Sequence, residues 1–496
     1  MVAPALPRKL DPDRLARELG NWRTASGSGP VYRGLADGIR MLIIDGRVPV
    51  GAQLPSERVL ADALRVSRTT VTSAYTQLGD DGYLHSRPGA RSVTALPAAA
   101  PPTAPRGSTP ALVPAGPGVN LAAAAMAAPA AAVLEAVRAA ATDLAPYLNG
   151  PGLELAGVVP LREAIAARYC VRGLPTTPDQ IMVTSGALQA IGLILATFIQ
   201  PGDRVLVEQP TFHGALAAIA TAGARAVPVA LNPEANEDVW DLDAFQFAIR
   251  QLAPNLAYLM PDNHNPVGLS MPAPSRNRLA QIISETRTRT IVDETMVDMW
   301  LDEPVPPPMA AAMTSRHDLV LTVGSMSKSF WGGLRVGWIR AERSALATVA
   351  AVRPSIDLGT PILEQLAAAK LLAMEDVVLP ERREIVRAGR TLMTALLAEH
   401  LPDWRPVSSG HWPTGGLALW VRLPAPMSSA LSAAASRLGV DLPPGPRFGV
   451  DGTLERYIRV PYTLPEDQLR GAVGLLTRAW HSVTGDTAAR PGHVVI

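Results

Sequence analysis

A proline-rich segment divides the chain into two parts that we expect to fold separately. Residues 96–118 hold seven prolines in 23 positions, and alanine, glycine, serine and threonine fill most of the others. Because proline fixes φ and has no backbone N–H, an ordinary helix or a central strand is excluded here. We therefore predict an exposed, semi-extended linker at 96–118, between a head at 28–95 and a body at 119–496.

Composition and charge narrow the class of protein. Of 496 residues, 48% are hydrophobic and 18% are charged, and the formal net charge of +1 excludes a whole-chain polyelectrolyte. Cys170 is the single cysteine, which excludes an internal disulfide framework and fits a reducing compartment. The longest apolar run, 187–199, is too short to span a bilayer, and the first residues lack an apolar stretch. We expect a cytoplasmic protein without a signal peptide or a membrane segment.

Three helices and a two-stranded ribbon are predicted in the head. Apolar residues recur there at helical spacing in three stretches. Gly46 would end the first helix, and Ser56 and Ser67 would be the N-caps of the second and third. Residues 82–93 are predicted to form the ribbon. The side chains expected to face the core of the head are Leu35, Ile39, Leu42, Ile43, Val59, Leu60, Leu64, Val71, Tyr75 and Leu78.

This order of elements is that of a winged helix-turn-helix, in which the third helix enters the major groove and the wing holds phosphates. Arg68 is the candidate for contact with guanine. Residues 1–95 hold 13 basic and 9 acidic side chains, a bias too weak to establish nucleic-acid binding alone. A small protein-interaction domain is the alternative. The candidate DNA-binding residues are Arg58, Ser67, Arg68, Thr69, Thr70, Thr72, Arg87 and Arg91.

Two motifs of the head resemble a known family. The runs Leu54-Pro55-Ser56-Glu57-Arg58 and Val66-Ser67-Arg68-Thr69-Thr70-Val71, followed by Gly82-Tyr83-Leu84, are similar to the DNA-binding head of the GntR superfamily. The wing departs from that pattern, because Gly89-Ala90-Arg91-Ser92 stands where the family usually has Gly-x-Gly-Thr. The resemblance implies binding to double-stranded DNA.

Lysine is rare in this chain, and one lysine has a distinctive setting. Among 45 basic residues, only Lys9, Lys328 and Lys370 are lysines. Lysine can lose its proton and attack a carbonyl, whereas arginine stays charged. Lys328 lies among serines and glycines, and Arg335 follows within reach of a phosphate. A Schiff-base lysine beside a phosphate site indicates pyridoxal 5′-phosphate (PLP). A lysine at an ordinary turn is the alternative.

The body alternates short apolar strands with helices, which predicts an α/β fold with a mostly parallel sheet. The strands are expected at 181–184, 204–207, 257–260, 290–292 and 319–323. Ligands bind at the carboxyl ends of such strands, where several polar or aromatic residues follow. Gly186 and Ala187 would offer backbone N–H groups to a phosphate. Phe212 would stack on a pyridine ring, Asn265 would bind its hydroxyl, and Asp293 would bind its nitrogen.

Each of these signals has an ordinary alternative: core packing for Phe212, a turn for Asn265 and a helix cap for Asp293. Together and in this order they resemble the fold-type I aminotransferases, from about Leu161 to Arg459, which is nearly the whole body. The resemblance implies that Lys328 is the aldimine lysine and Arg459 binds a substrate carboxylate. A surface arginine is the alternative for Arg459. The resemblance also implies the cofactor-binding set Lys328, Asp293, Asn265, Phe212, Ser325, Ser327, Arg335, Gly186 and Ala187, and no metal.

Two departures from the aminotransferase pattern are visible. A tyrosine usually follows the aspartate by two or three positions and binds the ring hydroxyl, but Thr295 and Met296 stand there. Neither is a phenol, which argues against efficient transamination while leaving the aldimine possible. The tyrosine that usually reaches the partner's phosphate has no clear counterpart, and Tyr147 stays unassigned.

A GntR-type head joined to an aminotransferase-like body resembles the MocR-type regulators. The resemblance implies a homodimer that binds PLP and senses a small amino compound or PLP itself. The hypothesis is that an amino effector displaces Lys328 from the PLP aldimine and thereby changes binding to a DNA operator. Two alternatives stay open: a working aminotransferase with a DNA-binding head, and a DNA-binding protein whose body is only a dimerisation scaffold.

Overall fold

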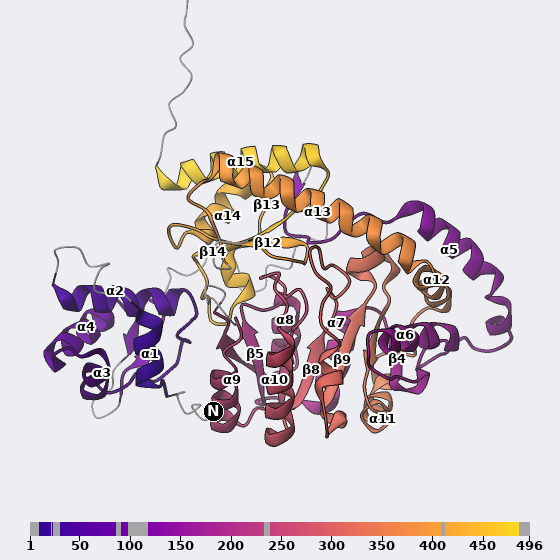
Figure 1. Ribbon diagram of the computed structural model, residues 1–496, viewed down its shortest axis with the longest axis horizontal. Helices are drawn as coiled ribbons and strands as arrows, with labels where there is room; N and C mark the ends of the chain where they lie inside the picture. The colour runs from indigo at the N-terminus through magenta and orange to yellow at the C-terminus, as the bar shows by residue number, and fades with distance from the viewer. Residues whose placement is uncertain are drawn as a thin grey trace, which may run out of the picture.

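The computed structural model describes residues 9–20, 22, 30–85, 91–97, 118–232, 239–407 and 412–485. A small helical head lies at one end of a larger α/β body (Figure 1). Arg87, one of the predicted DNA-binding residues, lies outside the described residues. Within them, no helix is long and apolar enough to cross a membrane.

The head contains one helix more than the three predicted. The additional helix α1 begins after its N-cap Asp11, whose carboxylate accepts a hydrogen bond from the backbone N–H of Arg14. Its Leu15 and Leu19 are buried in the core of the head. Lys9 forms a β-bridge with Gln53, so the chain already belongs to the head at residue 9. The helices of the head are α1 (Pro12–Leu19), α2 (Val31–Ile44), α3 (Glu57–Leu64) and α4 (Arg68–Asp80).

Most of the predicted core of the head is buried, but Leu64 is only half-buried and Val59 is exposed. Val59 is 40% exposed, because it lies on the outer face of the short α3 while Leu60 points inward. Ser67 caps α4 through a side chain that accepts from the Thr70 N–H, as predicted. Ser56 precedes α3 but makes no such bond. The ribbon consists of β1 (Leu84–His85) and β2 (Val93–Thr94), which pair antiparallel.

The body is built on a seven-stranded sheet in the order β4-β10-β9-β8-β7-β5-β6. All neighbours from β9 to β6 pair parallel, whereas β10 is antiparallel to both β4 and β9. The five predicted strands are present; β6 and β10 were not predicted. The strands are β4 (Ile181–Thr184), β5 (Arg204–Gln209), β6 (Arg225–Ala230), β7 (Leu256–Leu259), β8 (Arg289–Asp293), β9 (Val320–Ser325) and β10 (Gly337–Arg340).

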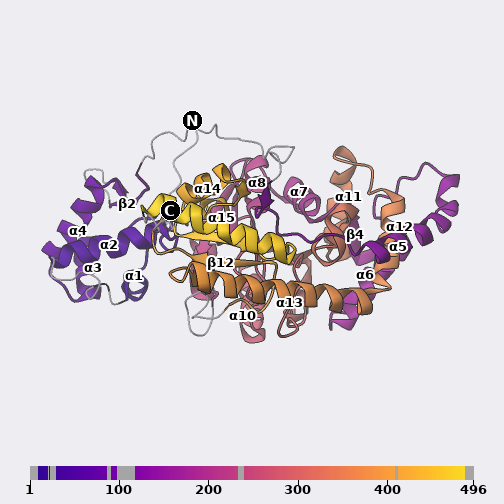
Figure 2. The same ribbon diagram turned by 90° about the horizontal axis from the view of Figure 1, so that it is seen from above.

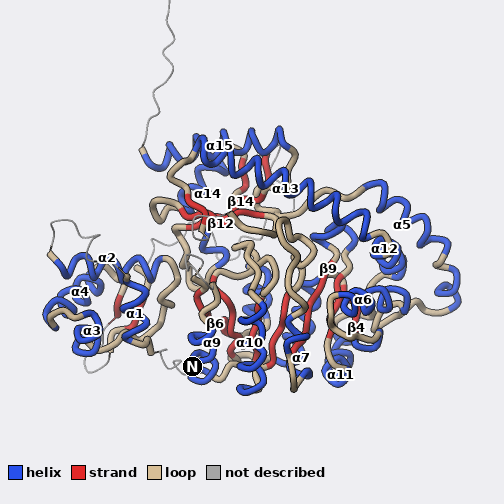
Figure 3. The backbone as a smooth tube through the Cα atoms, in the orientation of Figure 1, coloured by secondary structure: helices blue, strands red, loops and turns tan. Residues whose placement is uncertain are grey.

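Helices cover both faces of this sheet (Figure 3), which explains why its strands read as continuous apolar runs. Val205 and Val207 of β5 pack into one apolar cluster, with α7, α8 and α11, whereas Leu206 packs into the other. The helices around the sheet are α5 (Ala130–Thr142), α6 (Val159–Val171), α7 (Ala187–Phe198), α8 (His213–Thr221), α9 (Leu242–Leu252), α10 (Ala273–Thr286), α11 (Arg343–Val352) and α12 (Ile362–Leu372).

The last quarter of the chain forms a second lobe above the carboxyl ends of the strands (Figures 1 and 2). A three-stranded antiparallel sheet lies beneath its long helices. Two further short strands pair parallel and join the start of the body to this lobe: β3 (Val119–Asn120) and β13 (Val440–Asp441). The other elements are α13 (Glu375–His400), α14 (Ser428–Arg437), α15 (Glu466–Thr484), β11 (Arg405–Pro406), β12 (Ala418–Arg422) and β14 (Tyr457–Pro461).

The end of α2 contacts the body. Gln209 Nε2 donates a hydrogen bond to the Gly46 carbonyl over 2.8 Å. The Leu454 N–H donates to the Ile44 carbonyl over 2.7 Å. Gly46 has φ 72°, and a Cβ there would lie 2.3 Å from Gln209, so the close approach requires glycine.

Candidate functional site

The parallel strands bring the predicted site residues to one edge of the sheet. Asp293 is the last residue of β8, and Ser325 is the last of β9. Phe212 follows β5, and Ala187 begins the helix after β4. Asn265 follows β7, and its bond to Pro266 is cis, as the sequence allowed.

A cavity of about 220 Å³ lies at this edge. Its lining includes eight of the nine predicted cofactor-binding residues. The ninth, Gly186, is the N-cap of α7 beside Arg335. The cavity is lined by Ala187, Leu188, Phe212, Met260, Asp262, Asn265, Asp293, Thr295, Met296, Ser325, Ser327, Lys328 and Arg335.

Lys328 lies in a single π-helical turn, Ser327–Trp331, directly after β9. Its Nζ donates a hydrogen bond to the Ala124 carbonyl over 2.7 Å. Burial and, after it, the positive charge of Arg459 lower the pKa of Lys328 to about 8, against the opposing attraction of Asp293. A lysine with such a pKa has a much larger share of the neutral, nucleophilic amine at neutral pH than an ordinary lysine.

Asp293 is held by two donors that leave little freedom to its carboxylate. Tyr258 Oη donates to Oδ2 over 2.7 Å, and the Thr295 N–H donates to Oδ1 over 2.8 Å. Burial raises the pKa of Asp293, while these two hydrogen bonds lower it. Tyr258 was missed by the sequence reasoning, although a phenol in the apolar strand β7 needed a buried partner and so was a usable signal.

Ser325, Ser327 and Arg335 form a polar rim suited to a phosphate. Ser325 Oγ donates to Ser327 Oγ over 2.9 Å and accepts from the Ser327 N–H over 3.1 Å. Arg335 Nη2 donates to the Ser185 carbonyl over 2.9 Å. Gly186 has φ 94°, and a Cβ there would lie 2.7 Å from Arg335, so glycine lets the arginine approach the start of α7.

Arg459 lies in β14 of the second lobe and contacts Asn265, a lining residue of the cavity, although it does not itself line the cavity. It is 3% exposed, and its Nη1 donates to Asn265 Oδ1 over 3.4 Å. Its Nη2 donates to the Ala122 carbonyl. The Phe448 ring lies 4.9 Å from the guanidinium, and burial lowers the pKa of Arg459 to about 10. No carboxylate of the described residues forms an ion pair with this buried arginine. Arg459 is therefore suited to an anionic ligand.

His213 packs against Phe212 and Phe448 beside the cavity. Neither His213 nor Phe448 was predicted from the sequence. The His213 ring makes edge contacts with Phe212 at 5.0 Å and Phe448 at 5.6 Å. Burial, followed by the charges of Arg447, Arg459 and Lys328, lowers the pKa of His213 to about 3. His213 therefore stays neutral and does not add to the positive charge of the site.

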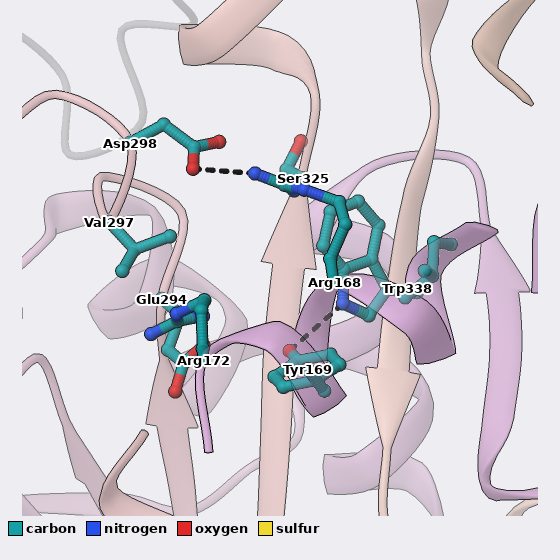
Figure 4. A pocket seen from close by; sticks show the side chains of 9 residues that line it. Arg168, Tyr169, Arg172, Glu294, Val297, Asp298, Ser325 and Trp338 are labelled. Carbon is teal, nitrogen blue, oxygen red and sulfur yellow. Dashed lines mark hydrogen bonds and ion pairs between the residues drawn. The ribbon is translucent and has the colours of Figure 1, made fainter. Parts of the chain in front are cut away.

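Buried charges line a second, smaller pocket, which shares Ser325 with the cavity (Figure 4). Arg168 pairs with Asp298 at 2.7 Å, and Arg172 pairs with Glu294 at 2.6 Å. Asp298 also accepts from Ser329, the neighbour of Lys328, and Glu294 is the neighbour of Asp293. Buried pairs of this kind fix geometry.

The structure places Thr295 and Met296 in the cavity lining, where the aminotransferase pattern has a tyrosine. The Thr295 Oγ1 is buried and has no hydrogen-bond partner among the described residues. Met296 offers only packing and a weak acceptor. The ring hydroxyl of a cofactor would therefore meet Asn265 without help from a phenol.

The predicted DNA-binding residues are mostly exposed at the start of α4 and near it. Arg68 pairs with Glu57 at 3.3 Å while its side chain stays 71% exposed. Ser67 has a structural role, because its hydroxyl is bonded to Thr69 and Thr70 as well as to the backbone of α4. Arg58 and Arg91 are exposed on α3 and beside β2.

Two known families cover the two parts of the chain. Residues 117–476 match aminotransferase class I and II, and residues 31–93 match the gntR family of bacterial regulatory proteins. The chain is 29% identical to YdcR, an HTH-type transcriptional regulator of Escherichia coli strain K12, over 86% of this chain and 94% of that protein. The chain belongs to the MocR-type regulators.

Transaminases are relatives of the body of this MocR-type regulator. The 2-aminoadipate transaminase of Thermus thermophilus is 30% identical over 65% of this chain and 79% of that protein. The solved structure of LysN from Thermus thermophilus, an alpha-aminoadipate aminotransferase complexed with N-(5′-phosphopyridoxyl)-L-leucine, is 26% identical. It matches with a TM-score of 0.64 over 74% of this chain and 93% of that one.

The cofactor of the MocR-type regulator is PLP, and the donors of the cavity fit it. Asp293 would supply a carboxylate for the pyridine nitrogen, and Asn265 would supply an amide for the ring hydroxyl. Phe212 supplies an aromatic face, and a Cβ at Gly214 would lie 2.4 Å from that ring, so glycine is needed beneath it. PLP supplies an aldehyde to a lysine amine and an electron-withdrawing ring.

Proposed function

We propose that the body of this MocR-type regulator senses a small amino compound through Lys328 and PLP, and that this changes how the head binds its DNA operator. The observation that carries the proposal is the setting of Lys328. Its amine has a pKa of about 8 and opens into the same cavity as Asp293 and Arg335. An amine in that state captures an aldehyde readily and can be displaced by another amine.

Arg459 is proposed to bind the carboxylate of the effector. Its guanidinium fork matches a carboxylate, and its contact with Asn265 brings it to the edge of the cofactor cavity. An amino acid held there by its carboxylate would present its amino group toward Lys328. The effector class that this favours is an amino compound with an acidic group.

We propose that the regulator acts as a homodimer, as is typical of the aminotransferase fold. Exposed apolar side chains support this, because a monomer rarely leaves so many uncovered. They lie mainly on or near α5, α7 and α12 and include Leu134, Leu148, Leu153, Leu188, Ile356 and Leu358. A regulator of bacterial operators works where the DNA is, and we propose the cytoplasm.

The test compares the purified chain with Lys328→Ala. We expect the unaltered protein to show an absorption band at roughly 400–430 nm, typical of PLP bound to lysine, and the variant to lack it. Lys370→Ala is the matched control, because Lys370 pairs with Asp143 on the surface, and it should keep the band. Equal spectra for Lys328→Ala and the unaltered protein would refute the proposal.

A working aminotransferase is the second candidate, favoured by Lys328, Asp293 and Asn265, which line one cavity, and by Arg459, which contacts Asn265. Met296 counts against it, because it leaves the ring hydroxyl without a phenol. Multiple turnovers of keto-acid formation from common amino donors would support the enzyme. A single exchange of the bound amine without turnover would support the sensor.

A further inference from the structure

The two cations proposed to bind cofactor and effector already bind the chain itself. Lys328 Nζ donates to the Ala124 carbonyl, and Arg459 Nη2 donates to the Ala122 carbonyl. Both acceptors belong to residues 121–126, which we call the strap; it crosses the site outside any helix or strand. A backbone carbonyl carries no net charge, so it is a weaker partner for either cation than an anion would be.

The strap is anchored by hydrogen bonds near its start and by three side chains buried in the main apolar cluster of the body, Leu121, Ala124 and Met126. The Val119 and Leu121 N–H groups donate to the carbonyls of Gly439 and Asp441 over 2.9 and 2.8 Å. Asn120 Oδ1 accepts from the N–H groups of Ala122 and Ala123 over 2.9 and 3.1 Å. The proline-rich linker ends at residue 118, so only the two residues of β3 separate the strap from the linker.

We propose that cofactor and effector displace the strap from Lys328 and Arg459, and that its displacement changes where the linker leaves the body. The inference rests on the proposed sensing function, because it uses the same two side chains. It gives that function a covalent connection to the head, since residues 118–126 are continuous with the linker.

The chemistry of the two ligands releases the strap in two steps. When the Lys328 amine and the aldehyde of PLP form a carbon–nitrogen double bond, one water leaves and the nitrogen keeps at most one hydrogen. Ala124 then loses its donor to the cofactor. A carboxylate at Arg459 replaces the Ala122 carbonyl, because it carries the opposite charge and can accept two parallel hydrogen bonds from the guanidinium. Strap and ligand therefore compete, and each weakens the hold of the other.

Hydrogen exchange on the unaltered, full-length protein tests the displacement directly. The probe is N-(5′-phosphopyridoxyl)-L-leucine, which carries a carboxylate and needs no bond to Lys328. We expect the probe to raise the exchange rate of the amides at 119–123 several-fold and to leave those of α9 unchanged. Unchanged or slower exchange at 119–123, while absorbance shows the probe bound, would overturn the inference.

A variant shows whether loosening the strap strengthens or weakens binding of the probe. Asn120→Ala removes the acceptor that holds the turn of the strap, and Asn277→Ala, at an exposed position of α10, is the matched control. We expect Asn120→Ala to bind the probe several-fold more tightly than the control does. Its DNA affinity without probe should move toward that of the probe-loaded, unaltered protein. A strap that closes over the ligand predicts weaker binding instead, and that result would refute displacement. Because the probe needs no lysine bond, failure of the Lys328 chemistry would leave both readouts intact.

Discussion

The head and the body present their functional residues in opposite ways. Arg58, Arg68 and Arg91 are exposed and come from neighbouring parts of one small domain. Asp293 and Arg459 are 5% and 3% exposed and lie on different lobes of the body. Surface residues act mainly through their own contacts with a partner, whereas buried ones depend on neighbours that fix them. We therefore expect substitutions in the head to affect DNA binding alone, and substitutions in the body to affect the cofactor first.

The largest effect is expected from Asp293→Ala. Two carboxylates are among the described residues that line the cavity, Asp262 and Asp293. Asp262 pairs with Arg276, so the change removes the one that is placed for the pyridine nitrogen. A hydrogen bond to a charged group contributes about 1.5–3 kcal/mol, so we expect PLP to bind about 10- to 150-fold more weakly. Titration of absorbance measures this. Asp467→Asn, at an exposed position of α15, should bind PLP normally.

Arg68→Ala should affect the head alone. Loss of one bidentate contact with guanine costs about 1–3 kcal/mol, or about 5- to 150-fold in operator affinity. Electrophoretic mobility shifts at several salt concentrations measure it, and the absorbance of bound PLP should stay the same. Arg250→Ala, on the surface of the body, is the control. A change in the PLP spectrum of Arg68→Ala would contradict the expectation that substitutions in the head affect DNA binding alone.

The pKa of Lys328 predicts how capture of PLP depends on pH. Below about pH 8 the neutral amine is the minor form, and its share grows about tenfold per pH unit. Stopped-flow absorbance of the protein stripped of PLP should show a capture rate that rises with pH and levels off above about 8. Nα-acetyl-lysine, whose side-chain amine is free, is the control. Its capture rate should keep rising with pH up to about pH 10.4. A protein rate that follows the free amine would mean that burial does not act on Lys328.

Tyr258→Phe should have a moderate effect with a spectroscopic signature. Without the phenol, the pKa of Asp293 rises further, because that hydrogen bond favours the carboxylate. The pyridine nitrogen then carries less positive charge, so the ring withdraws less electron density from the nitrogen of Lys328. We expect the pH midpoint of the colour change of bound PLP to rise. Tyr462→Phe, which loses a bond to the Gly416 carbonyl, should leave this midpoint unchanged.

Ser67→Ala should have the smallest effect, on the stability of the head. Loss of an N-cap hydrogen bond costs about 1 kcal/mol. Thermal unfolding followed by circular dichroism should show a lower midpoint for the head and no change for the body. Ser73→Ala, at an exposed position within α4, is the control. Equal losses in the two variants would show that the cap contributes nothing special.

The same contrast explains what could be predicted from the sequence. The α4 cap and the inner face of Val71, Tyr75 and Leu78 follow from local spacing, and the structure confirms both. The gathering of Asp293 and Ser325 was predictable because parallel strands share one carboxyl edge. The role of Ala122 and Ala124 was not, because backbone carbonyls carry no sequence signal. Helix α1 was missed because eight residues are too few for a stable helix without packing against α2 and α3, although Asp11 is a local capping signal.

Cys170 has a practical consequence. It is the only thiol of the chain, it is exposed, and it lies in the last turn of α6 on the side of the body away from the head (Figures 1 and 2). A fluorophore attached there reports from a fixed landmark without any substitution to remove competing thiols. One engineered cysteine on α2 would complete a donor–acceptor pair, and the distance between the two ends of the molecule could then be followed in real time on operator DNA.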